Sequence, residues 1–152
     1  MNEDVKQVAV NRKARHDYDI RDTMEAGIAL TGTEIKSIRE GRANLTDAYV
    51  QVKNREAWLM DMHVTPYSHG SYANHDPRRP RKLLLHRDEI IRLAGQIAQK
   101  GLTVVPLRLY LKDGRAKVEI AVAKGRKSYD KREAMATRDA EREVERALKG
   151  DW

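Results

Sequence analysis

The feature that most constrains the fold is a pair of predicted strands joined by an Asp-Gly pair. The strands are expected over 102–111 and 115–123, with Lys112-Asp113-Gly114 between them. Asp-Gly favours the type I′ turn because both residues tolerate positive φ, so the pattern predicts a tight antiparallel hairpin. Pro106 has no N–H to donate, and its strand is therefore expected to run along an edge or to carry a bulge there.

Shorter alternating segments precede this hairpin. Successive side chains of a strand point to opposite faces, so a period of two residues predicts half-buried strands. These segments begin at His16, Met24, Tyr49 and Trp58. The last of them ends at Pro66.

Two helices are predicted between the strands. Thr31 and Glu34 have the spacing of a capping box, and Gly41 suits the end of the short helix that follows. A longer helix begins after Leu85, carries an apolar stripe and closes at Gly101. Several short antiparallel strands with inserted helices predict a mainly β domain that forms a small antiparallel barrel. We expect a flexible arm over residues 1–10, the barrel over 11–123 and a tail over 124–152.

The composition of the chain changes sharply after Ala123. Five bases fall within residues 124–132, where Asp130 is the one acid. The stretch from Ala134 to Lys149 favours a helix but has a thin apolar stripe. We therefore expect a tail that is disordered alone and helical when bound, and the alternative is a helix packed back onto the barrel.

Basic residues suggest the class of partner. The 30 Lys and Arg residues outnumber 23 Asp and Glu, and the net charge of +7 favours a polyanion. One basic run lies in the tail. The other lies in the loop before the second helix and consists of Arg78, Arg79, Arg81 and Lys82. Both runs are expected to contact phosphates, and the alternative is an ordinary solvated surface.

Flat rings next to cations suggest stacking on unpaired bases. His16 and Tyr18 lie beside Arg12, Lys13 and Arg15, a combination that suits an RNA with exposed bases. Tyr18 could equally point into the core.

Catalysis, metal binding and membrane insertion find little support. The chain has no Cys, and the cluster of His63, His69, His75 and Asp76 matches no compact zinc spacing. No Gly-rich phosphate loop or nucleophile elbow is present. No apolar stretch approaches the roughly 18 residues of a membrane span. We expect a cytoplasmic protein without cofactor, metal or catalytic residue, and a monomer when free.

Several longer motifs together resemble one family, the small protein B or SsrA-binding proteins. The resemblance runs from about Asn11 to Lys149. The motifs are Asn11-Arg-Lys-Ala-Arg-His-Asp-Tyr18, Glu25-Ala-Gly27, Leu30-Thr-Gly-Thr-Glu-Ile-Lys-Ser37, Gly41-Arg-Ala-Asn44, His75-Asp-Pro77, Arg81-Lys-Leu-Leu-Leu-His86, Lys124-Gly-Arg-Lys127 and Asp130-Lys-Arg132. The chain departs from the family in having Leu111 where an aromatic residue is common and in ending with Gly150-Asp151-Trp152.

The resemblance implies a barrel of the oligonucleotide-binding type and an adaptor rather than an enzyme. Its partners would be the tRNA-like domain of tmRNA and ribosomes stalled on messages without a stop codon. The residues matching the family's RNA-contacting face are Asn11, Lys13, His16, Glu25 and Leu84. A carboxylate such as that of Glu25 would accept hydrogen bonds from base amino groups or 2′-hydroxyls.

The tail has a separate role by the same resemblance. It would enter the message channel of the small subunit and occupy the decoding centre. The matching residues are Lys124, Arg126, Lys127, Tyr129, Asp130, Lys131 and Arg132. The alternative function is a general single-stranded or ribosomal RNA-binding barrel without specificity for tmRNA.

Overall fold

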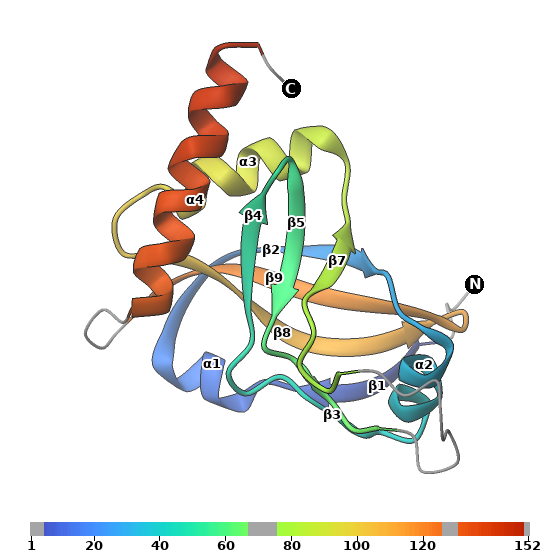
Figure 1. The fold of residues 1–152 in the computed structure, drawn as a ribbon. Coiled ribbons are helices and arrows are strands. Elements are labelled where there is room, and N and C mark those ends of the chain that lie inside the picture. The colour runs from blue at the N-terminus through green and yellow to red at the C-terminus, as the bar shows by residue number, and fades with distance from the viewer. Residues whose placement is uncertain (1–4, 67–75, 126–130, 151–152) are drawn as a thin grey trace.

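The structure, a computed structural model, describes residues 5–66, 76–125 and 131–150 (Figure 1). In chain order its elements are β1 (Val5–Val10), α1 (Arg12–Asp17), β2 (Tyr18–Ile28), α2 (Gly32–Arg39), β3 (Ala43–Asn44), β4 (Tyr49–Lys53), β5 (Glu56–Met60), β6 (His63–Val64), β7 (Arg81–Leu84), α3 (Arg87–Ile97), β8 (Leu102–Lys112), β9 (Arg115–Gly125) and α4 (Lys131–Leu148).

Most of the strands form one antiparallel sheet of seven, in the order β1-β8-β9-β2-β7-β5-β4, and β3 pairs with β6. The predicted mainly β class is confirmed. Strand pairing does not close this sheet, because β1 and β4 form its two edges, so the predicted barrel is open. In Figure 1, β4 and β5 cross the long strands steeply, which gives the sheet a strong bend.

The hairpin of β8 and β9 is confirmed in detail. Asp113 has φ 51° and Gly114 has φ 80°, as a type I′ turn requires, and Lys112 lies opposite Arg115. The register shifts between Pro106 and Arg108, so the strand contains the bulge that was one of the two predicted arrangements. Because β1 covers the other side of β8, this strand is not an edge.

The predicted flexible arm is wrong for residues 5–10. They form β1, which pairs with β8 from Val5 opposite Lys112 to Val10 opposite Arg108. Its polar sequence gave no alternation because β1 is an edge strand with little buried surface. Residues 1–4 lie outside the described part of the chain.

The predicted strand at His16 is also wrong at its start. Residues Arg12–Asp17 form the short helix α1, and the strand begins only at Tyr18. The helix begins at Asn11, whose Oδ1 accepts a hydrogen bond from the Ala14 N–H at 3.1 Å. An Asn followed by helix-forming residues was the local signal for this cap.

The main core lies between the inner face of the sheet and the helices α3 and α4. Leu109 and Ile120 from the sheet and Leu93 from α3 are fully buried there. A smaller apolar cluster lies on the opposite face, where Ala14 of α1 packs against Leu107 of β8. Helix α1 therefore covers one end of the outer face, below the long strands in Figure 1, whereas α3 and α4 lie above them.

Helix α4 packs on the body of the protein. Ala136 and Ala140 are buried against the core, whereas Leu148 near its end is 84% exposed. The Glu143 carboxylate is buried and accepts hydrogen bonds from the backbone N–H groups of Asn54 at 2.7 Å and Arg55 at 3.2 Å. The structure thus has the alternative arrangement of the tail, a helix packed on the body, instead of the expected disorder.

We expect Glu143→Ala to release α4 from the body. The change leaves the turn between β4 and β5 without its acceptor, and a hydrogen bond to a charged group contributes about 1.5–3 kcal/mol. Amide hydrogen exchange in α4 should therefore accelerate by about tenfold or more. The matched control is Glu145→Ala, which removes only an exposed pair with Lys149 at 3.2 Å. Equal exchange rates in the two variants would contradict the proposed anchor.

Candidate RNA-binding face

The outer face of β2, β8 and β9 is polar along its length beyond α1. Residues directly opposite each other in a ladder project to the same side, and so do residues two apart in one strand. The registers therefore place one set of side chains together, which we call the polar face: Glu25, Arg108, Tyr110, Lys112, Arg115, Lys117 and Glu119. The alternate residues of the same strands, such as Leu109 and Val118, fill the core.

Ion pairs connect α1 to the polar face. Glu119 Oε1 lies 3.6 Å from Arg108 Nε and 3.9 Å from Arg15 Nη2. The Arg108 guanidinium lies 4.4 Å from the centre of the Tyr110 ring, in a cation–π contact. The helix and the strands therefore present one continuous surface.

Glu25 is held by its neighbours on the polar face. The Tyr110 hydroxyl donates to Glu25 Oε2, and Lys112 Nζ lies 3.6 Å from Oε1. The Tyr110 hydrogen bond lowers the pKa of Glu25, and Lys112 and Lys117 add to this effect and outweigh burial. Burial and the same carboxylate raise the pKa of Tyr110. At neutral pH the pair is therefore a protonated phenol bound to a carboxylate.

Leu84 lies beside Glu25. Leu84 is opposite Gly27 in the pairing of β7 with β2, and Gly27 is two residues from Glu25 on the same side of β2. A Cβ on Gly27 would lie 3.1 Å from the Leu84 Cβ, so the missing side chain lets Leu84 lie across β2. Leu84 is 54% exposed. The structure thus brings an exposed apolar residue next to an acceptor.

Lys13 and His16 project from α1 at the far end of this surface. Lys13 Nζ lies 3.3 Å from Asp47 Oδ1, and its side chain is 56% exposed. His16 Nδ1 lies 3.0 Å from Asp17 Oδ1, and its side chain is 82% exposed. Exposed pairs of this kind are weak, so both side chains are available to a ligand.

Asn11 differs from the other predicted RNA-contacting residues. It is 2% exposed, and its Nδ2 donates to the carbonyl oxygens of Leu45 at 3.1 Å and Pro106 at 2.9 Å. Its Oδ1 caps α1. In the structure the polar atoms of this side chain are therefore bound within the protein, and its RNA contact stays a prediction. Its bonds tie α1 to the bulge of β8.

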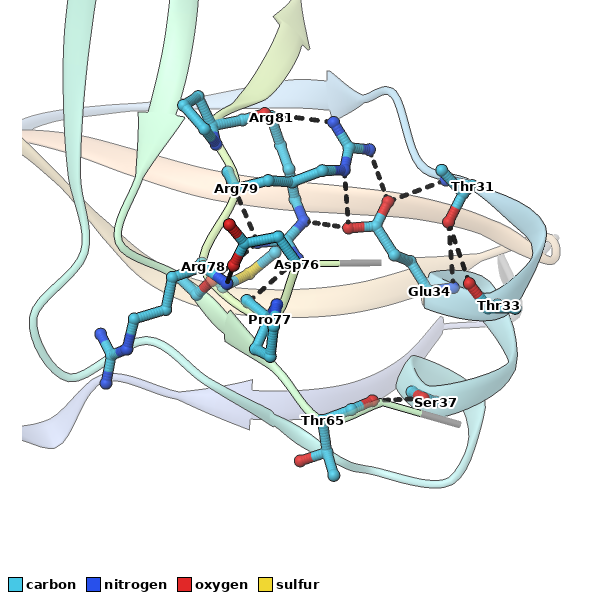
Figure 2. Close-up of polar contacts among 12 residues, drawn as sticks. Thr31, Thr33, Glu34, Ser37, Thr65, Asp76, Pro77, Arg78, Arg79 and Arg81 are labelled. Carbon is cyan, nitrogen blue, oxygen red and sulfur yellow. Dashed lines mark hydrogen bonds and ion pairs between the residues drawn. The ribbon is translucent and has the colours of Figure 1, made fainter. Parts of the chain in front are cut away.

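The basic loop does not form the predicted phosphate site. Figure 2 shows Arg79 and Arg81 both directed at the Glu34 carboxylate. Arg81 Nε lies 2.5 Å from Oε2 and Arg79 Nη2 lies 2.5 Å from Oε1, and the Arg81 side chain is fully buried. Burial raises the pKa of Glu34, but the hydrogen bonds from Arg79, Thr31 and Arg81 outweigh burial, and the net effect is a lowered pKa. The carboxylate therefore stays charged and pairs with two of the four bases of this run.

Two further cations of this loop also have partners. Lys82 Nζ lies 3.1 Å from Glu56 Oε1. The exposed Arg78 donates from Nη1 to the Asp61 carbonyl oxygen at 3.3 Å. Within the described residues, each base of this run therefore has a partner in the body of the protein.

Most of the predicted tail site lies outside the described residues. Lys124 is exposed at the end of β9. Arg126, Lys127, Tyr129 and Asp130 fall in the undescribed segment, and the side chains of Lys131 and Arg132 are likewise not described.

The sequence predicted neither a metal site nor a membrane-spanning segment. Of the histidine cluster, His69 and His75 are outside the described residues. Within the described ranges, no three His, Cys, Asp or Glu side chains are placed to hold a metal ion. No helix in those ranges is long and apolar enough to cross a membrane.

The fold and the polar face define a small β protein with a charged outer sheet surface, and comparison with known proteins gives its family. A family model described as "SmpB protein" matches residues 8–150. The chain therefore belongs to the SmpB family.

Individual relatives match over nearly their whole length. The SsrA-binding protein of Roseiflexus castenholzii is 62% identical, with 93% of this chain and 90% of the relative covered. That of Acidothermus cellulolyticus is 59% identical, with 94% and 90% covered. A chain of the solved structure "tmRNA-SmpB: a journey to the center of the bacterial ribosome" is 48% identical with a TM-score of 0.69, and the match covers 91% of this chain and 97% of that one.

Proposed function

We propose that this protein binds tmRNA, also called SsrA RNA, and acts with it on the bacterial ribosome in trans-translation. The observation that carries the proposal is the similarity to SsrA-binding proteins at about 60% identity over more than nine tenths of the chain. The tRNA-like domain of tmRNA is the part that we assign to the body of the protein. The second part of the proposal is delivery of this RNA to ribosomes stalled on messages without a stop codon, and the similarity to a chain of "tmRNA-SmpB: a journey to the center of the bacterial ribosome" supports it.

We assign the RNA contact to the outer face between α1 and β7. Lys13 and His16 supply exposed polar groups at one end, and Glu25 and Leu84 lie together at the other. Cations bind phosphates, the carboxylate accepts from hydroxyl or amino groups, and Leu84 packs on a ribose or base. Asn11 supports this surface from within by capping α1.

The tail is assigned to the ribosome. Its bases suit the phosphates of the message channel, and Tyr129 suits stacking on ribosomal RNA. The residues of this proposed site are Lys124, Arg126, Lys127, Tyr129, Asp130, Lys131 and Arg132. The protein acts as an adaptor in the cytoplasm and not as an enzyme.

The test compares two RNAs at one salt concentration. A labelled tRNA-like RNA should bind more tightly than an unstructured RNA of equal length. Leu84→Ala should weaken binding of the tRNA-like RNA alone by about tenfold, because the variant loses the free energy of burying one Leu side chain in the complex. Leu148→Ala is the matched control, because Leu148 is also exposed but lies at the end of α4. Equal affinity for both RNAs would favour a general RNA-binding protein instead.

A further inference from the structure

We propose that helix α4 is an autoinhibitory latch, which is docked on the body in the free protein and has to leave it before the tail can act on the ribosome. The inference rests on the proposed function and adds a closed state of the free protein to it. In Figure 1, α4 lies beside β4, an edge strand of the sheet, and next to α3. The docked helix therefore covers a strand edge that would otherwise be open.

The turn between β4 and β5 is the main anchor of the helix. Asn54 and Arg55 have left-handed backbones, with φ of 54° and 65°, and Lys53 lies opposite Glu56 in the ladder. The N–H groups of both turn residues lie outside the ladder and donate to the Glu143 carboxylate. A left-handed conformation is unfavourable for a residue with a side chain such as Arg55, and it persists where its surroundings hold it. The carboxylate therefore stabilises the turn, and the turn in exchange holds the helix.

The second anchor is polar as well. Gln51 Nε2 donates to Asp139 Oδ2, which joins the middle of β4 to α4. Of the described side chains of α4, Ala136 and Ala140 are buried in the core and Val144 is partly buried. Alanine side chains bury little apolar area, so these contacts alone hold the helix weakly. Docking therefore depends on the two carboxylates and can be reversed by changing single residues.

Docking restricts the basic tail. Strand β9 holds the chain as far as Gly125, and the docked α4 holds it again from Lys131. A segment fixed at both ends can project by only half of its extended length of about 3.4 Å per residue, whereas a segment fixed at one end can project by all of it. Undocking also frees the 18 residues of α4 itself. The bases that we assign to the message channel can therefore move far from the body only after α4 has left β4.

The docked helix thus competes with the ribosome for the tail. A partner that binds only the open form has its apparent affinity reduced in proportion to the fraction of the protein that is open. The two polar anchors set this fraction, so the loss of either anchor should strengthen binding of the tail to the ribosome. RNA binding on the outer face between α1 and β7 involves neither anchor and should not change.

The first test locks the helix on the body. The chain has no cysteine, so Gln51→Cys with Asp139→Cys introduces two unique thiols at positions whose side chains are in contact. A short crosslinker with a reducible disulfide should then lower tagging on stalled ribosomes by at least about 100-fold, because the locked protein has almost no open fraction, and a reductant should restore it. The matched control is Lys53→Cys with Glu56→Cys, which joins β4 to β5 and leaves α4 free. Equal tagging by the two crosslinked proteins would overturn the latch.

The second test releases the helix. Glu143→Ala and Gln51→Ala should each raise the affinity of the free protein for small ribosomal subunits with an empty message channel by about three- to tenfold, because each removes one anchor. Glu145→Ala removes an exposed acid from the same helix and measures the effect of charge alone. Gln51→Ala changes no residue of the tail, and thermal unfolding confirms that the variants are folded. Affinities for Glu143→Ala and Gln51→Ala no higher than that for Glu145→Ala would contradict autoinhibition.

Failure of the proposed function has a different signature. If the wild-type protein and the control crosslinked protein both fail to support tagging, the proposed function is wrong. If both support tagging and the locked protein does so equally well, the latch alone is wrong. Binding of a tRNA-like RNA by the locked protein should stay within about threefold of the wild-type value, since a factor of three corresponds to less than 1 kcal/mol.

Discussion

Replacing Glu34 with Ala is expected to lower the free energy of unfolding by about 3–5 kcal/mol, because the change leaves the fully buried Arg81 charge without its partner. The same carboxylate also binds Arg79 and accepts the Thr31 N–H at 2.8 Å, so α2 loses its capping box at the same time. Urea unfolding measures the effect. Total stabilities are about 5–15 kcal/mol, and the variant should therefore be close to unfolding at 37 °C.

The control for this experiment is Glu56→Ala. Glu56 pairs with Lys82 at 3.1 Å, but both side chains are substantially exposed, and such pairs contribute at most about 1 kcal/mol. A loss for Glu34→Ala no larger than that for Glu56→Ala would mean that the buried cluster does not stabilise the fold. Glu34→Gln keeps the shape of the side chain and should fall between the two.

Neutralising the basic tail should separate the two proposed activities. We expect alanine at five tail bases to reduce tagging on stalled ribosomes by at least about 100-fold, since each charge-assisted contact contributes about 1.5–3 kcal/mol. Binding to a tRNA-like RNA should stay within about threefold, because we assign that contact to the outer face between α1 and β7. A reconstituted translation reaction and an RNA titration measure the two effects. The five bases are Lys124, Arg126, Lys127, Lys131 and Arg132.

The control removes equal charge from the body. Substituting five exposed bases outside the polar face should leave tagging nearly unchanged, which separates a local role from the effect of net charge. These bases are Lys6, Lys36, Arg39, Lys53 and Arg92. Loss of tagging in both variants, or loss of RNA binding together with tagging in the tail variant, would contradict separate roles.

Local signals in the sequence were sufficient to predict an element when its conformation depends only on neighbouring residues. Asp113 and Gly114 specify their turn through their own backbone preferences. Thr31 and Glu34 are three residues apart, so the capping box depends on nothing outside the helix. The predicted antiparallel hairpin, both predicted helices and the mainly β class followed from such signals.

Distant partners explain what the sequence did not predict. Arg81 lies in a basic run and has the composition of a phosphate-binding residue, but its partner Glu34 is 47 residues away. The amide of Asn11 binds Pro106, 95 residues away, which no local pattern reveals. The polar edge strand β1 likewise forms only because it pairs with β8, which is distant in the sequence. The hydrogen bond of Tyr110 to Glu25 depends in the same way on strand register.

The candidate site was predicted in part. The family motifs brought Glu25 and Leu84 into one proposal, and their proximity in the structure follows from Gly27 between them. No sequence signal pointed to Tyr110 or Lys117 as members of the polar face, because neither belongs to a basic run or a quoted motif. Their place on the polar face follows from the register of β8 with β9.

The cluster around Glu34 has a consequence for how chains of this kind can vary in length. Val64 N–H donates to the Pro77 carbonyl oxygen at 2.9 Å, and Arg81 Nη1 donates to that of Met62 at 2.7 Å, so the chain before residue 67 is joined directly to the chain after residue 75. Doubling the length of a segment whose ends are already held together costs only about 0.6 kcal/mol in closure entropy. Insertions and deletions between these two anchors should accumulate freely during divergence, whereas Glu34 and Arg81 can change only together.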